Sequence, residues 1–132
     1  MSEQADIRTA FAALLATTLQ IPVARFVPGT LRTDSGYLEA ADPYLDFTGP
    51  AATFRRPALR LWLMLVSPST DWERSMGWID DKVALLRSVP VTTLVAGRQC
   101  PMIATVAPYG VLDVKALAFR VTFTPIQLGA LT

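Results

Sequence analysis

Apolar residues near the start of the chain recur with the period of an α-helix. The residues at i, i+4, i+7, i+8 and i+12 form one apolar stripe, and they are Ile7, Phe11, Leu14, Leu15 and Leu19. Ser2 and Asp6 are suitable N-terminal caps, and Pro22 cannot continue a helix. The pattern predicts an amphipathic helix that ends before Pro22, then a short strand over 23–27.

Residues 28–57 have a different character. They are rich in Pro and Gly, they carry the acids Asp34, Glu39, Asp42 and Asp46, and they hold the aromatic residues Tyr37, Tyr44, Phe47 and Phe54. A loop this long is usually functional or disordered, and disordered segments are poor in aromatic residues. We therefore expect an extended arm or loose hairpin over 28–57 that meets a partner. A loop folded back over its own domain is the alternative.

The clearest strand follows the arm, over 58–66. Leucines alternate on one face, at Leu59, Leu61, Leu63 and Leu65, and the other face receives Arg60, Trp62, Met64 and Val66. Only Arg60 is charged, so we expect both faces to be covered, one by helices and one by a neighbour or the arm.

A second helix is predicted between Ser67-Pro68 and Pro90. Thr70 and Glu73 have the spacing of a capping box. One apolar seam contains Trp72, Met76, Ile79, Val83 and Leu86, as in a helix that lies on a sheet.

The last third predicts β structure. We expect strands over 102–107, 111–114 and 117–124, with a turn at Pro108-Tyr109-Gly110. The uncharged tail 126–132 should dock on its own domain or in a neighbour's groove. Together these elements predict a single α+β domain over 1–132. Its mixed or antiparallel sheet should carry two helices on one face and a long extended arm.

The composition of the 132-residue chain adds a hint of assembly. Apolar residues make up 52% and charged residues 17%, whereas soluble domains have about 25% charged residues. Either the core is unusually well filled, or other subunits cover part of the surface; we favour the second. The cations are mainly arginine, which suits interfaces and equally suits the codon usage of a GC-rich genome.

Little in the sequence points to catalysis, a cofactor or a metal. Histidine is absent, and one cysteine, Cys100, excludes an internal disulfide and a zinc cluster built from this chain alone. The net charge of +1 does not steer the chain to nucleic acid. The longest uncharged run, 9–24, is too short for a membrane span. We expect no enzyme and synthesis in the cytoplasm.

Candidate interface residues come from the arm, the second helix and the tail. They share an aromatic, arginine or large apolar side chain, and they are Tyr37, Tyr44, Phe47, Phe54, Arg55, Arg56, Trp78, Ile126 and Leu128.

The order of elements resembles a known family. The resemblance rests on Thr53-Phe54-Arg55-Arg56-Pro57 running into 59–66, on Ser67-Pro68-Ser69-Thr70-Asp71-Trp72 opening a helix, and on Tyr109-Gly110-Val111 before the strand over 117–123. The chain is similar in these features to the tail terminator (tail completion) proteins of long-tailed phages, especially those of actinobacteria.

This resemblance implies a structural virion protein with no catalytic residues. It implies a homohexameric ring at the head-proximal end of the phage tail, in contact with the major tail tube protein and the head-side connector or stopper. DNA would only pass through the ring, no membrane would be involved, and the protein would be made in the host cytoplasm. Two alternatives stay open: another neck or tail tube subunit, and a non-viral ligand-binding α+β domain whose pocket holds Trp62, Trp78 and Tyr109.

Overall fold

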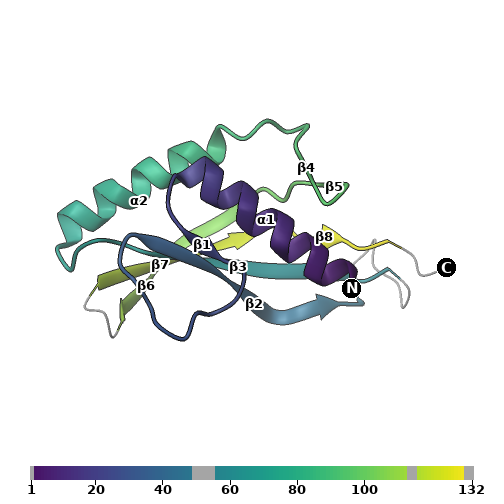
Figure 1. Cartoon of the computed structure of the whole chain (residues 1–132), viewed down its shortest axis with the longest axis horizontal. Helices are drawn as coiled ribbons and strands as arrows, with labels where there is room; N and C mark the ends of the chain where they lie inside the picture. The colour runs from purple at the N-terminus through teal and green to yellow at the C-terminus, as the bar shows by residue number, and fades with distance from the viewer. Residues whose placement is uncertain (1, 49–55, 113–115, 130–132) are drawn as a thin grey trace.

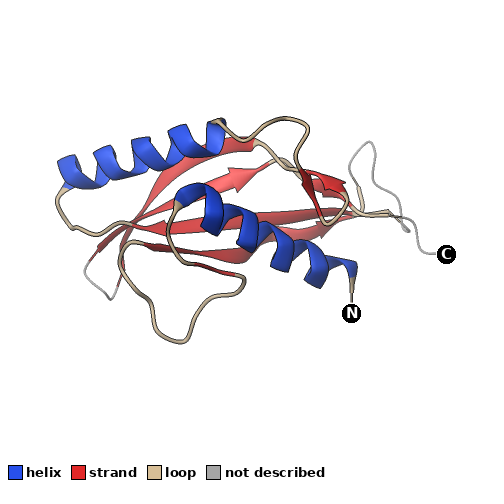
Figure 2. Ribbon diagram, turned by 45° about the horizontal axis from the view of Figure 1, so that its top comes forward, coloured by secondary structure: helices blue, strands red, loops and turns tan. Residues whose placement is uncertain are grey.

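The computed structural model describes residues 2–48, 56–112 and 116–129. Two helices lie on one face of a mixed, mainly antiparallel sheet (Figures 1 and 2), which confirms the α+β class. In chain order the elements are α1 (Glu3–Leu19), β1 (Val23–Ala24), β2 (Ser35–Asp46), β3 (Ala58–Val66), α2 (Trp72–Arg87), β4 (Leu94–Val95), β5 (Arg98–Gln99), β6 (Ile103–Leu112), β7 (Ala116–Phe123) and β8 (Ile126–Gln127).

The main sheet has the strand order β1-β2-β3-β7-β6, and β8 pairs with the start of β3. The pairs β2–β3, β3–β7 and β7–β6 are antiparallel, and only the short β1–β2 pair is parallel. β3 therefore lies in the middle of the sheet, as its two-sided apolar sequence requires.

The helix-side core joins both helices to the leucine face of β3. It includes Leu63 from β3, Phe119 from β7 and Ile79 from α2, all at most 2% exposed. Phe11 of α1 meets Phe123 of β7 edge to face, with ring centroids 5.0 Å apart, a favoured aromatic geometry. The stripe predicted for the first helix therefore does face the sheet.

The capping of α2 differs from the predicted box. The N-cap is Asp71, whose Oδ1 accepts a hydrogen bond from the Glu73 amide at 3.2 Å. The N-cap is therefore one residue later than the predicted Thr70. Ser69 Oγ accepts a hydrogen bond from the Asp71 amide at 2.9 Å, and this bond holds the turn that precedes the helix. A carboxylate cap at this end also meets the positive end of the helix dipole.

The predicted arm is largely a strand. Ser35–Asp46 forms β2, which pairs with β3 from Ser35↔Val66 to Asp46↔Ala58, with an irregularity between Ala40 and Leu45. β1 pairs with Gly36 and Tyr37 of β2, and no other described strand pairs with the outer side of β2. An open edge tolerates proline and acidic residues, and these residues disguised the strand in the sequence.

The second face of β3 is covered from within the chain. Met64 and Val66 are buried together with Tyr37 of β2 and with Ala116 and Ala118 of β7, and Leu31 of the β1–β2 loop packs against them. Both faces of β3 are therefore covered, as expected, but these two positions need no neighbouring subunit.

Two further expectations in the last third are corrected. The predicted turn at Pro108-Tyr109-Gly110 lies inside one strand, β6, whose register shifts between Pro108 and Gly110. Gly110 adopts a φ of 135°, a value open to glycine, and this lets the strand continue past the irregularity. The sequence reading also missed the β4–β5 hairpin, which turns at Ala96 and Gly97, both with positive φ.

The start of the tail docks on its own domain. β8 pairs with β3, and Ile126 and Leu128 are buried in the helix-side core. The Gly129 amide donates to the Glu3 carboxylate of α1 at 3.1 Å, and Arg98 forms an ion pair with the same carboxylate. These bonds tie the end of the described chain to its beginning.

Candidate subunit interface

The residues expected at an interface do not form one surface. Ile126 and Leu128 belong to the helix-side core, and Tyr37 is buried beneath the opposite face. These three side chains are at most 7% exposed, so they have almost no area to offer a neighbour, and they are removed from the candidate interface. Phe54 and Arg55 lie outside the described residues.

The other candidates are accessible to different degrees. The Tyr44 hydroxyl accepts from Arg8 Nη2 at 2.9 Å. Trp78 Nε1 donates to Asp34 Oδ1 at 2.9 Å, which fastens α2 to the β1–β2 loop. Phe47 and Arg56 are exposed. Tyr44 and Trp78 thus have partners inside their own domain, and the interface role of these four residues stays a prediction.

The edge strand β6 lies at the end of the strand order of the main sheet. It contains no charged residue from Ile103 to Leu112, and the side chains from Ala104 to Tyr109 are all exposed. Tyr109 is 53% exposed and Val106 36%. Within the described part of the chain, no strand pairs with its outer side. Monomeric proteins usually protect such an edge with charged residues, prolines, bulges or a covering segment, because open backbone groups pair with other chains. β6 has Pro108 and two register shifts but no charged residue, so it carries only part of this protection.

An arginine is held between two aromatic rings on the helix-free face of the sheet, beside β6. The Arg120 guanidinium of β7 lies 3.9 Å from the Trp62 ring centroid and 4.8 Å from that of Tyr109. Arg120 Nε is buried and has no hydrogen-bond partner among the described residues. Stacking leaves the edges of the guanidinium, with their N–H donors, available to a carboxylate.

The aromatic pocket of the ligand-binding alternative is not assembled. Trp62 and Tyr109 meet through Arg120 on the helix-free face, whereas Trp78 lies on α2 and packs against the helix-side core. The sheet separates Trp78 from the other two, so the three residues cannot line one pocket.

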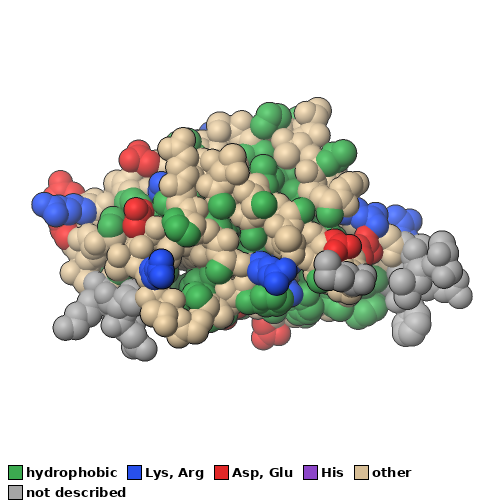
Figure 3. Space-filling model, in the orientation of Figure 1, with side chains coloured by type: hydrophobic (Ala, Val, Ile, Leu, Met, Phe, Trp, Pro, Cys, Tyr) green, Lys and Arg blue, Asp and Glu red, His purple; other side chains and the backbone are tan. Residues whose placement is uncertain are grey.

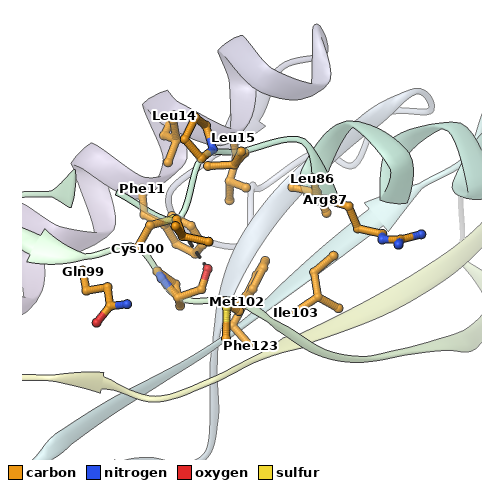
Figure 4. A pocket seen from close by; sticks show the side chains of 14 residues that line it. Phe11, Leu14, Leu15, Leu86, Arg87, Gln99, Cys100, Met102, Ile103 and Phe123 are labelled. Atoms are coloured by element: carbon orange, nitrogen blue, oxygen red, sulfur yellow. Dashed lines mark hydrogen bonds between the residues drawn. The ribbon is translucent and has the colours of Figure 1, made fainter. Parts of the chain in front are cut away.

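An apolar groove of about 260 Å³ opens on the helix side. Figure 4 shows Phe11 and Leu15 of α1, Leu86 of α2 and Phe123 of β7 around it. Cys100 also lines this groove, and burial raises the pKa of its thiol, which makes it a poor nucleophile at neutral pH. In Figure 3, hydrophobic side chains are exposed over the neighbouring segment between α2 and β6, where Val91 and Leu94 are exposed.

The described residues offer no arrangement for metal chemistry. They contain no group of three or more Cys, Asp or Glu side chains placed to hold a metal ion. In the same described ranges, no helix has the length and apolar character to cross a membrane.

Tyr37 gives the helix-free face a pH dependence that can be measured. Burial raises the pKa of its phenol above the usual 10.0, the nearby Glu39 and Tyr109 raise it further, and Arg120 opposes the rise. When the pH rises past 10.0, the unfolded chain loses this proton first, so unfolding becomes more favourable. We expect the urea midpoint of the wild type to fall more between pH about 9 and about 11 than that of Tyr37→Phe. An equal fall in both proteins would contradict this assignment.

Sequence reasoning missed β6 as the leading interface candidate, although a signal was present. The run from Ile103 to Leu112 is uncharged and mostly apolar, but it was divided into two strands and a turn. Its position at the edge follows from the strand order, which the sequence pattern did not supply.

Comparisons with known proteins place the fold. No protein-family model matches the sequence, and no curated protein matches it. Among solved structures, the chain is similar to one in a structure described as "Virion of native gene transfer agent (GTA) particle". The TM-score is 0.57 at 12% sequence identity, and the alignment covers 97% of this chain and 96% of that chain. At this identity the likeness shows a shared fold, which extends over 97% of this chain.

Proposed function

We propose that the chain is a structural subunit of a phage-like virion. The observation that carries the proposal is the fold likeness to a chain of a gene transfer agent virion over 97% of this chain. The likeness covers the domain as a whole and is not confined to one segment of it. The uncharged open edge of β6 supports the same proposal, because it suits a protein that is stable in an assembly.

Within this class we propose a tail-terminator-like role. The subunit would close into a homohexameric ring at the head-proximal end of the tail and end the growth of the tail tube. Its partners would be other copies of itself, the major tail tube protein and the head-side connector. DNA would pass through the ring without specific contacts, and the protein would have neither a catalytic residue nor a cofactor. The order of elements in the sequence supports this finer proposal.

The ring is tested by mass photometry and negative-stain microscopy of the purified chain. We expect a particle with the mass of six 14.4-kDa chains and ring-shaped images. A tube subunit would instead give filaments of variable length, because a ring that stacks on itself does not stop at one layer. Arg74→Glu is the control: it changes an exposed side chain of α2 and breaks its surface ion pair with Asp71 at 3.9 Å, which contributes little to stability, so the ring should be unchanged.

A second measurement tests whether the chain forms rings only when it is bound to the end of a tail tube. Added to tail tube protein from the same particle, the chain should bind tube ends and shorten the tubes in proportion to its concentration. A chain that stays monomeric at every concentration and neither binds nor shortens tubes would contradict the proposed function.

A further inference from the structure

Among the described residues, the main sheet has two edges, on opposite sides, with which no further strand pairs. One is β6, the last strand in the order, and the other is the part of β2 beyond its short pairing with β1. Each is long for an edge strand, because β6 spans Ile103–Leu112 and β2 continues to Asp46. Each edge presents backbone N–H and C=O groups that a further strand could pair with.

The two edges run in opposite directions. Going from β2 to β3, from β3 to β7 and from β7 to β6, every neighbouring pair is antiparallel, so β6 is antiparallel to β2. Rotation about an axis roughly along the strands keeps the direction of each strand. In a ring built by such a rotation, β6 of one copy would therefore meet β2 of the next copy in an antiparallel arrangement, which is the better-bonded pairing.

The side chains at the two edges have complementary charge. Glu39 and Asp42 lie on β2, and the described residues give neither of them an ion pair. β6 is flanked by two arginines. Arg120 stacks on its Tyr109 on the helix-free face, and Arg87 lines the helix-side groove together with Ile103 at its start. Neither arginine has an ion-pair partner among residues 2–48, 56–112 and 116–129.

Glu39 and Arg120 also lie at similar positions along the strand direction within one copy. On the helix-free face, Glu39 belongs to the row Glu39, Trp62, Thr122, Thr105, and Arg120 belongs to the row Tyr37, Met64, Arg120, Ala107. Residues two apart on one strand lie on the same face, so these are neighbouring rows. In a ring whose rotation adds no shift along the strands, Glu39 of the next copy would lie one row from Arg120, which is on β7, one strand in from β6.

We propose that copies of the chain join edge to edge, with β6 of one copy pairing antiparallel with β2 of the next. This inference rests on the proposed function, because it supplies the contact that a ring of identical copies needs. The contact is heterologous: each copy uses its neutral, arginine-flanked edge toward one neighbour and its acidic edge toward the other. A symmetric β6–β6 dimer would instead place arginines opposite arginines, which disfavours it.

A pair of charge-reversed variants tests the joint under the conditions in which the wild type forms its ring. In Arg87→Glu/Arg120→Glu both edges are acidic, and in Glu39→Lys/Asp42→Lys both edges are basic. Each variant alone should require a concentration at least ~10-fold higher to self-associate in sedimentation velocity, because like charges now meet across the joint. The equimolar mixture should recover a particle of wild-type size, because each acidic edge then meets a basic one.

Matched controls remove the effects of net charge and folding. Asp80→Lys/Asp81→Lys makes the same change in net charge as Glu39→Lys/Asp42→Lys, but on α2, and should assemble like the wild type. The neutral variant Arg87→Gln/Arg120→Gln should assemble more weakly than the wild type. Mixing it with Glu39→Lys/Asp42→Lys should not restore a particle of wild-type size. Thermal melts must show that each variant is folded before its assembly is measured.

The outcomes separate the joint from the proposed function. If the wild type forms rings and Glu39→Lys/Asp42→Lys assembles normally, the β6–β2 contact is overturned and the proposed function stands. Failure of the mixture to recover the wild-type particle, with both variants folded, would also overturn the joint. If the wild type neither self-associates nor binds tube ends, the proposed function and the joint fall together.

Discussion

Replacing Leu38 with alanine should lower the free energy of unfolding by about 2–5 kcal/mol, the range for a leucine truncated in a core. Leu38 is 1% exposed and lies opposite Leu63 in the β2–β3 register. The truncation removes apolar contacts in the helix-side core and leaves a cavity that the neighbouring strand cannot fill without strain. Urea unfolding followed by circular dichroism measures the change.

This variant separates the strand from the arm expected from the sequence. An arm that contacts only partners would tolerate Leu38→Ala, and a loss below about 0.5 kcal/mol would contradict the strand. Glu39→Ala is the matched control on the next residue. Its side chain lies on the opposite face of β2 and has no ion pair among the described residues. At protein concentrations below self-association, its effect on stability should therefore stay within about 0.5 kcal/mol.

The second large effect is expected at the contact between α1 and β7. Phe11→Ala should cost about 3–5 kcal/mol of unfolding free energy, because the ring is 1% exposed and fills the space between the helix and the sheet. Its edge-to-face partner is Phe123. A double-mutant cycle of Phe11→Leu and Phe123→Leu should give a coupling of about 0.5–1.5 kcal/mol for the aromatic pair.

Thr17→Ala provides the control for this pair, since Thr17 is exposed on the same helix and its loss should change stability by no more than about 0.5 kcal/mol. A cost for Phe11→Ala no larger than that of Thr17→Ala would place α1 away from the sheet. Additive effects of the two leucine variants would mean that the rings stabilise the fold only through their area.

The sequence predicted those elements whose side chains repeat with a clear period. α1 follows its apolar stripe, and β3 has the predicted bounds, because a helix on one face and a central strand both require long regular patterns. The fold class followed from these two elements together with the alternation of β7. The capping box of α2 was wrong because Thr70 and Asp71 are both good caps, and only the preceding turn decides between them.

β2 was misread because local signals and tertiary pairing disagree there. Pro43 and three acids argue against a strand, yet β3 offers a long apolar partner, and past Tyr37 no described strand pairs with the outer side of β2. The pairing with β3 decides the outcome. Tyr37 followed the same error: as an aromatic residue in a supposed arm it suggested an interface, but in the strand it is buried under the helix-free face.

The interface candidates show where sequence reasoning runs out. Ile126 and Leu128 are apolar near the end of the chain, and the sequence left open whether they dock on their own domain or on a neighbour. β8 and the helix-side core decide for their own domain. The open edge of β6, in contrast, is a property of strand order, and no window of residues around Val106 contains that information.

The contacts of Glu3 with Gly129 and Arg98 hold the beginning and the end of the described chain next to each other. The two ends of the described chain therefore emerge at the same end of the domain (Figure 1). A label or fusion partner attached at either end would project from one pole of the molecule. In a ring of identical copies, both attachment points would then mark the same rim, and one tag would be enough to orient the particle in an image.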